Sequence, residues 1–207
     1  MSSGWDPPSE LWGAISRDLL APDGNATDDF SQLFARLSAL STRLDHSLGS
    51  SESDFLSSAL YRPEILAKFT SWISRKESVD VHVAFCELLS DFQPQRKKKI
   101  VTDDEEKEVI SALKKYSLGL AVSAPSSRSR VSGLRLLEST LLSLESGNKD
   151  DLESWAESLQ IDNMVTTFQK MISQGVSKHT ASVIRSINIV LGVVCKIFSG
   201  HVSTCHG

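Results

Sequence analysis

The amino-acid sequence predicts an all-α protein, arranged as a helical solenoid of about eight or nine helices. Apolar residues recur at three- and four-residue steps along most of the chain, which is the period of an amphipathic helix. Prolines, glycines and short polar runs interrupt this period. The segments between the interruptions fall into successive helix pairs. Together these three observations predict helices that stack on one another.

Two helices are predicted in the first fifty residues. Ser9 is the expected N-cap of the first helix, and Pro22 lies just beyond its end. The second helix is expected to begin at Thr27 or Asp28 and to end at Gly49, because glycine commonly ends helices. The two apolar stripes consist of Leu11, Trp12, Ile15, Leu19 and Leu20 in the first helix, and of Phe30, Leu33, Phe34, Leu37, Leu40, Leu44 and Leu48 in the second.

Three shorter helices are predicted before residue 93. Residues 54–61 form a weak helix, and Pro63 suits the first position of the next one. Residues 80–92 are predicted to be helical because Val81, Ala84, Phe85, Leu88 and Leu89 share one side. Val79, Val81 and Val83 also alternate as they would in a strand, so a competing strand pattern is present here.

Residues 93–104 are the main interruption of the helical pattern. This stretch contains Pro94, a basic run and the start of an acidic run. The acidic residues are expected at a helix N-terminus, where negative charge is favourable. We therefore divide the chain into an N-terminal helical lobe (1–92), a charged linker (93–104), C-terminal helical repeats (105–199) and a flexible tail (200–207).

The C-terminal part carries the clearest helical pattern. After the helix that follows the acidic run, residues 128–145 form a long amphipathic helix, and further helices are predicted over 150–159, 162–175 and 178–198. Helix pairs thus recur about every 40 residues, within the range of HEAT and armadillo units, and a HEAT/armadillo-like solenoid is expected. A closed bundle in two lobes is the alternative. The last helix is apolar on more than one face, so a neighbouring element is expected to cover it.

Composition and charge are those of an ordinary globular protein. Hydrophobic residues make up 40% and charged residues 23%, and the formal net charge is −4, which gives no indication of a nucleic-acid partner. The three cysteines lack a paired spacing, which is typical of a reducing compartment. The most apolar run, residues 187–195, is shorter than the about 20 residues that cross a bilayer. We therefore expect an intracellular protein without a membrane partner.

Metal and cofactor sites have little support in the sequence. His201, Cys205 and His206 lie close together in the tail, but zinc sites usually use two well-separated pairs of ligands. The glycines are scattered and form no phosphate-binding loop. We therefore predict no metal and no cofactor.

One pair of residues resembles a catalytic arrangement. His82 precedes Cys86 by about one helical turn, so the imidazole and the thiol would lie on the same helix face. The neighbouring Phe85 and Leu88 predict instead that Cys86 is a buried core thiol. We therefore predict no catalytic residues.

The basic run consists of Arg96, Lys97, Lys98 and Lys99. Such a run is typical of a nuclear localisation signal, which is the functional hypothesis for these four residues. A contact with phosphate is a second interpretation. A solvated loop, with its charge offset by the acidic run that follows, is the third.

A motif in the C-terminal part resembles a known family. It consists of Arg130, Gly133, Leu134, Leu136 and Leu137, followed by Trp155 and by a helix with Ile184, Ile187 and Leu191. With these residues, the segment 130–199 resembles the N-terminal helical region of the proline-, glutamic acid- and leucine-rich scaffold family of the rixosome, which acts in large ribosomal subunit maturation. The resemblance implies a nuclear or nucleolar HEAT-like scaffold that has no catalytic residues and binds protein partners on pre-ribosomal particles.

The functional hypothesis is therefore a non-enzymatic protein–protein interaction scaffold, in the nucleus or nucleolus or otherwise in the cytoplasm. One alternative is a cytoplasmic adaptor or regulatory domain in trafficking or cytoskeletal assembly. Another is an enzyme whose site is assembled from dispersed residues. A continuous concave groove lined by exposed residues would favour the scaffold. A deep enclosed pocket containing His82, Cys86 or another titratable group would favour the enzyme.

Overall fold

A computed structural model describes residues 7–21, 29–44, 50–92 and 103–145, together with positions 165–166, 168–169, 173, 181, 184–185, 187–192 and 195. All regular secondary structure in these residues is helical. The helices are α1 (Pro8–Leu20), α2 (Phe30–Leu44), α3 (Ser50–Ala59), α4 (Pro63–Ser71), the short 3-10 helix η1 (Lys76–Ser78), α5 (Val79–Asp91), α6 (Asp103–Ser123) and α7 (Ser127–Glu145). The all-α prediction is confirmed.

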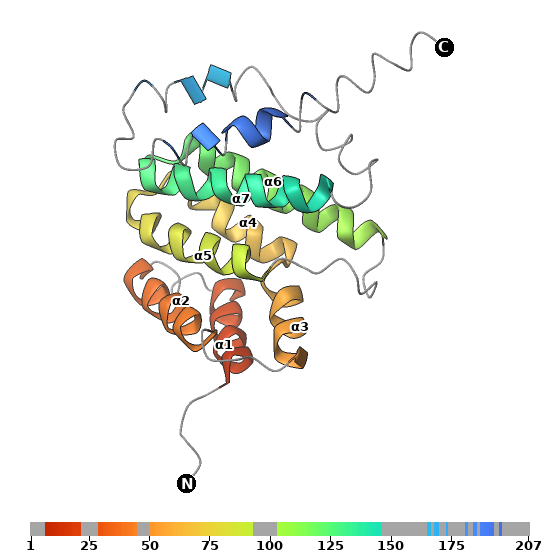
Figure 1. Ribbon diagram of the computed structural model, residues 1–207. Coiled ribbons are helices and arrows are strands. Elements are labelled where there is room, and N and C mark those ends of the chain that lie inside the picture. Colours follow the sequence, from red (N-terminus) through yellow and green to blue (C-terminus); the bar gives the residue numbers. More distant parts are fainter. Residues whose placement is uncertain are drawn as a thin grey trace.

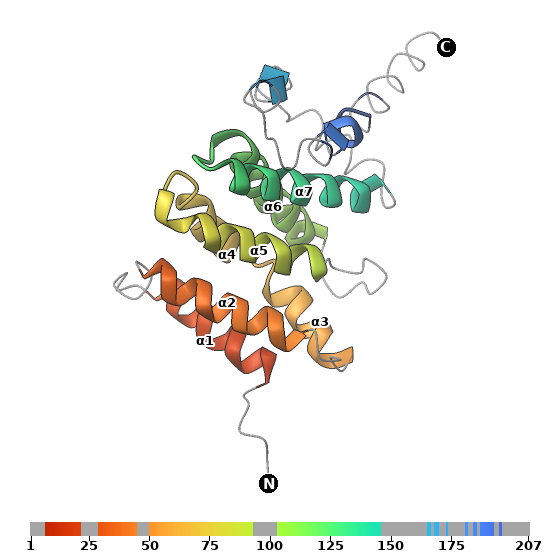
Figure 2. The same cartoon turned by 60° about the vertical axis from the view of Figure 1, so that its left-hand side comes forward.

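The long helices stack in two rows (Figure 1). In one row α1 contacts α4, and α4 contacts α6; in the other row α2 contacts α5, and α5 contacts α7. Figure 2 shows the pairs α1–α2, α4–α5 and α6–α7 as successive levels, with α3 beside α1. Each pair therefore lies against the next one along the stack.

The helix starts follow local chemistry, with corrections to the predicted starts of α1 and α2. The N-cap of α1 is Pro7, and Ser9 is already inside the helix. The prediction for Ser9 was wrong because proline is favoured in the first turn of a helix, so Pro8 starts the helix one position earlier. Pro63 begins α4 as predicted. The second helix, α2, begins at Phe30 and not at Thr27 or Asp28 as predicted. Asp29 caps it, since its carboxylate accepts a hydrogen bond from the Gln32 amide at 3.0 Å.

Residues 79–91 are helical, in agreement with the predicted helix and in spite of the alternating valines. The resulting helix α5 contacts α2 on one side and α7 on the other. Val81, Val83 and Cys86 are all buried, although they do not lie on one narrow stripe of the helix. A helix that is covered from several sides is apolar over much of its circumference, and this explains why the valine pattern resembled a strand.

An aromatic cluster lies at the centre of the core. The rings of Phe69 in α4 and Phe85 in α5 are stacked, with centroids 3.8 Å apart. Tyr116 in α6 packs against both rings, at centroid distances of 6.2 and 5.8 Å. Trp12 and Trp72 are buried and pack onto this cluster through Phe85 and Phe69. Residues from both sides of the predicted linker therefore contribute to one core.

Several predicted elements lie outside the described residues. They are residues 93–102 of the linker, the helix over 150–159, Trp155 and the tail over 200–207. Within the predicted helices over 162–175 and 178–198, the described positions are all helical. Phe168, Ile187 and Val190 in this part are buried.

Helices α6 and α7 approach each other closely at Gly133. A Cβ atom at this position would lie 2.5 Å from the Leu120 Cβ and 2.8 Å from the Ala121 amide nitrogen. Both of these atoms belong to or adjoin the α6 backbone, so they cannot move without a shift of the helix. The absence of a side chain at Gly133 therefore sets the spacing between α6 and α7.

Substitution of Gly133→Ala is expected to destabilise the protein by about 3 kcal/mol, because the added methyl group forces the two helices apart. Gly13→Ala in α1 is the matched control, since a Cβ there meets no atom within 4 Å. Alanine at this second position should stabilise the fold by about 0.5 to 1 kcal/mol through its higher helix propensity. Urea unfolding followed by circular dichroism measures both changes. Equal effects of the two substitutions would contradict the spacing role of Gly133.

Candidate functional site

An open groove lies between α1 and α3, with a volume of about 410 Å³. Its lining consists of Ser9 and Glu10 from α1 and of Ser51, Glu52 and Phe55 from α3. The Phe55 side chain is 47% exposed, which makes it the most exposed of the large hydrophobic residues that the structure describes. We call this feature the α1–α3 groove.

The sequence of α3 explains why Phe55 faces outward. Leu56 in α3 and Leu60 just beyond it are fully buried, and their four-residue spacing fixes the face that packs against the rest of the protein. Successive residues of an α-helix point about 100° apart, so Phe55 cannot share the direction of Leu56. The helix therefore buries its leucines and leaves an aromatic ring at the groove.

Glu52 fixes the groove by joining its two helices. Its Oε1 atom accepts hydrogen bonds from the backbone amide of Ser9 at 3.2 Å and from the Ser9 hydroxyl at 3.1 Å. The first turn of an α-helix has amides without intrahelical partners and carries partial positive charge, both of which favour a carboxylate. Because the cap of α1 is a proline with no side-chain hydrogen bond, Glu52 supplies this interaction from another helix.

The charged groups in the groove have one sign. Glu10 and Glu52 are both acidic, and the lining residues that the structure describes include no lysine or arginine. The sequence of α3 adds Asp54 and contains no basic residue. An exposed aromatic ring thus lies beside two carboxylates, an arrangement suited to an apolar side chain with a nearby cation.

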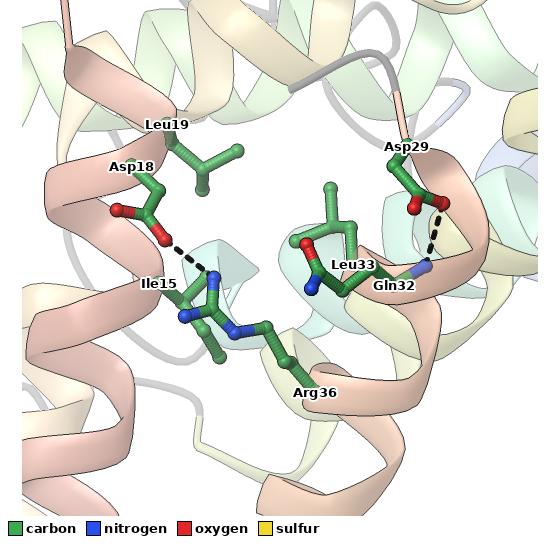
Figure 3. A pocket seen from close by; sticks show the side chains of 7 residues that line it. All are labelled: Ile15, Asp18, Leu19, Asp29, Gln32, Leu33 and Arg36. Atoms are coloured by element: carbon green, nitrogen blue, oxygen red, sulfur yellow. Dashed lines mark hydrogen bonds and ion pairs between the residues drawn. The ribbon is translucent and has the colours of Figure 1, made fainter. Parts of the chain in front are cut away.

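A second, much smaller cavity lies between α1 and α2 (Figure 3). Its volume of about 10 Å³ is enough for about one water molecule. Arg36 of α2 reaches across to Asp18 of α1, and their ion pair spans 2.5 Å. Asp29 is occupied as the cap of α2. The polar groups here connect the two helices, and the space is too small for a substrate.

The candidate pair His82 and Cys86 lies in the core and lines neither of these cavities. Nδ1 of His82 lies 3.0 Å from the Tyr116 hydroxyl, and the Cys86 Sγ lies 3.9 Å from the same oxygen. Tyr116 therefore connects the two side chains across α5 and α6. The buried position that its apolar neighbours predicted for Cys86 is confirmed.

Burial keeps these groups neutral. It raises the pKa of the Cys86 thiol to about 12, so the nucleophilic thiolate is negligible near neutral pH. Burial also lowers the pKa of His82 to about 4, against a weaker opposing influence of the Trp72 carbonyl. The pKa of Tyr116 is raised well above its ordinary value, mainly by burial. The cluster is thus a set of neutral polar groups in an aromatic core, with none of the activation that a catalytic thiol needs.

The other predicted site residues are not described. Arg96, Lys97, Lys98 and Lys99 lie outside the described residues, as do His201, Cys205 and His206. Within the described part of the chain, no group of three potential metal ligands comes together. None of the helices described is long and apolar enough to cross a membrane.

Comparisons with protein families, with curated proteins and with solved structures found no match to this chain. The resemblance of residues 130–199 to the rixosome scaffold family stays a prediction. In the structure, Leu134, Leu136 and Leu137 of that motif are fully buried, and Gly133 sets the spacing of α6 and α7. These four residues are packing positions.

Sequence reasoning missed the α1–α3 groove. Ser9 was assigned only a capping role, and Phe55 received no role. One local signal was present, since Phe55 directly precedes Leu56 and thus falls off the stripe that Leu56 and Leu60 define. The approach of α1 to α3 has no local signal, because Ser9 and Glu52 are 43 positions apart.

Glu52→Ala is expected to lower the free energy of unfolding by about 1 kcal/mol, because α1 loses the carboxylate that binds its first turn. Amide hydrogen exchange should become faster in the first turn of α1 and in α3, while exchange in α5 stays unchanged. Ser51→Ala, on the same turn of α3, is the control and should leave both measurements close to wild type. Unchanged exchange at the start of α1 in the Glu52 variant would contradict this role.

His82 is expected to make the stability of the protein fall in acid. Its pKa is lower in the folded state than the ordinary value of 6.5, so protons bind preferentially to the unfolded chain. This contribution to stability is complete above pH 6.5 and is lost as the pH falls toward 4, by about 3 kcal/mol at pH 4.

The measurement compares wild type with His82→Asn, in which an amide group replaces the ring nitrogen near Tyr116. The difference in unfolding free energy between the two proteins, from urea titrations at pH 8, 6 and 4, isolates this histidine because the carboxylates are common to both. Wild type should lose its advantage over the variant as the pH falls. A difference that is constant across these pH values would rule out the role of His82.

Proposed function

We propose that this protein is a non-enzymatic protein-interaction scaffold with HEAT/armadillo-like stacked helix pairs, and that the α1–α3 groove is one of its binding surfaces. The observation that carries this proposal is the exposure of Phe55 in that groove. Burying a phenylalanine side chain contributes roughly 1.5 to 3 kcal/mol, and here part of that contribution remains available to a partner. Aromatic residues are enriched at the centres of protein–protein interfaces.

The rigidity of the groove supports a binding role. Leu56 and Leu60 anchor α3 in the core, and the hydrogen bonds of Glu52 hold it against α1. A surface that is already ordered loses less conformational entropy when a partner binds. The Phe55 ring is therefore presented on a helix whose position is set before binding.

The arrangement of the helices supports the solenoid part of the proposal. The pair α1–α2 contacts α4–α5, and α4–α5 contacts α6–α7, so neighbouring pairs bury each other's apolar faces. Solenoid proteins are built in this way and bind partners on their exposed helices. The sequence pattern of a pair about every 40 residues agrees with this arrangement.

A nuclear role in large ribosomal subunit biogenesis is the more specific proposal. It is supported by the resemblance of residues 130–199 to the rixosome scaffold family and by the basic run from Arg96 to Lys99. Both features concern the sequence. The identity of the partners therefore tests the role in ribosome assembly, and the effect of substituting Phe55 tests the binding role of the groove.

Affinity purification of the full chain followed by mass spectrometry tests both the binding role of the groove and the nuclear role. Phe55→Ala is expected to reduce the recovery of specific partners at least about fivefold, since truncation of a central aromatic residue commonly costs more than 1 kcal/mol of binding energy. Phe34→Ala is the matched control, because Phe34 is also a partly exposed aromatic residue, on α2 and outside the groove.

The possible results of the purification distinguish the nuclear role from the binding role of the groove. Large-subunit assembly factors among the wild-type partners would support the nuclear role, and their absence would remove that role while leaving the scaffold. If Phe55→Ala and Phe34→Ala retained the same partners at wild-type levels, the groove would have no binding role. Circular dichroism spectra of both variants establish that each one is folded.

A further inference from the structure

We propose that the α1–α3 groove binds a basic amphipathic segment of a partner protein, with an apolar side chain against Phe55 and a lysine or arginine beside Glu10 and Glu52. This inference rests on the proposed function, because it specifies the chemistry of the partner at the same groove. The exposed ring of Phe55 and the negative charge around it together define the chemistry of the segment that binds.

The apolar side chain of the proposed segment is inferred from Phe55. Its ring is the only hydrophobic side chain among the lining residues described, and it is flanked by serines and carboxylates. A single aromatic ring inside a polar rim matches one apolar anchor residue on the partner, since hot spots tend to pair across an interface. Two helices with a groove between them are also a recurring surface for binding short segments.

The lysine or arginine of the proposed segment is inferred from the negative charge of the residues that line the groove. Glu10 is exposed in the first turn of α1, and Glu52 is partly buried and oriented by its hydrogen bonds to Ser9. The next basic residue along α1 is Arg17, about two turns further on, and its Nε donates to the carbonyl of Gly13. A cation placed beside Phe55 would therefore interact with two carboxylates, and an acidic segment would be repelled.

The Phe55 ring also favours a cation near its face. Lysine and arginine are attracted to aromatic rings within about 6 Å of the centroid. The same preference occurs within this protein, where Lys68 lies 5.6 Å from the Trp72 ring centroid and Arg75 lies 5.8 Å from the Phe30 ring centroid.

The charge of the groove argues against a second copy of this chain as the occupant. A two-fold symmetric dimer through this surface would place the groove of one copy against the same groove of the other. Glu10 and Glu52 would then face identical carboxylates, which opposes association. A different protein with a complementary basic segment avoids this repulsion.

Photo-crosslinking of the full chain tests the inference. The protein is prepared with the photoreactive amino acid p-benzoylphenylalanine in place of Phe55, mixed with an extract of the cells that produce it, irradiated, and analysed by mass spectrometry for the crosslinked peptide. The expected peptide comes from another protein and contains an apolar residue with at least two lysines or arginines within about two helical turns.

A synthetic copy of that crosslinked peptide then provides the quantitative test by fluorescence anisotropy. Glu10→Lys should weaken binding about fivefold, because it replaces an attraction by a repulsion at the rim. Glu64→Lys is the control, a charge reversal in the first turn of α4 and outside the groove, where Glu64 is paired with Arg62, and it should bind like wild type. A peptide with its lysines and arginines replaced by glutamate should bind Glu10→Lys better than wild type.

Each other outcome overturns the inference. These outcomes are a crosslink to a second copy of this chain, a crosslinked segment that is acidic or uncharged, no crosslink, or equal affinities for Glu10→Lys and wild type. If Phe55→Ala still removes partners in the purification while the segment lacks basic residues, the inference fails and the scaffold proposal stands. If Phe55→Ala removes no partner, the groove fails as a binding surface.

Discussion

The contact of Phe69, Phe85 and Tyr116 is the interaction on which the rest of the structure depends. The three rings come from α4, α5 and α6, so they connect the two rows of helices and both sides of the stretch at residues 93–102. Trp12 of α1 stacks on Phe85, which extends the same contact to the first helix pair. Such large rings bury much apolar area and hold the helices at fixed spacings. The centre is therefore the part of the fold least able to change.

Polar groups within this centre have a structural role. His82, Tyr116 and Cys86 lie together among the aromatic rings, and burial favours their neutral forms. A buried hydroxyl is costly unless it has a partner, and His82 provides one for Tyr116. The pair that resembles a catalytic arrangement in sequence thus serves as an internal connection between α5 and α6. This arrangement makes the stability of the fold sensitive to acid, because a protonated His82 is poorly accommodated in an apolar core.

The α1–α3 groove, unlike the buried aromatic centre, is an exposed surface. It lies at the end of the stack, where α3 packs mainly on α1 and where the hydrogen bonds of Glu52 add to the burial of Leu56 and Leu60. A short helix in this position has fewer neighbours than α5, so one of its aromatic residues stays accessible. The same carboxylate that fixes α3 also gives the groove its negative charge. In the proposed function, Glu52 would therefore serve both the stability of the groove and its recognition of a partner.

The sequence by itself determined the helices, because helical periodicity and proline at the first helical position are local properties, as residues 128–145 and Pro63 illustrate. It also determined that Cys86 is buried, since its neighbours are apolar. Only the tertiary structure decided which helices meet. Ser9 and Glu52 are 43 positions apart, and His82 and Tyr116 are 34 apart. No periodic pattern encodes such pairs, since they depend on how side chains fill the space between helices, and the α1–α3 groove exists only because of that packing.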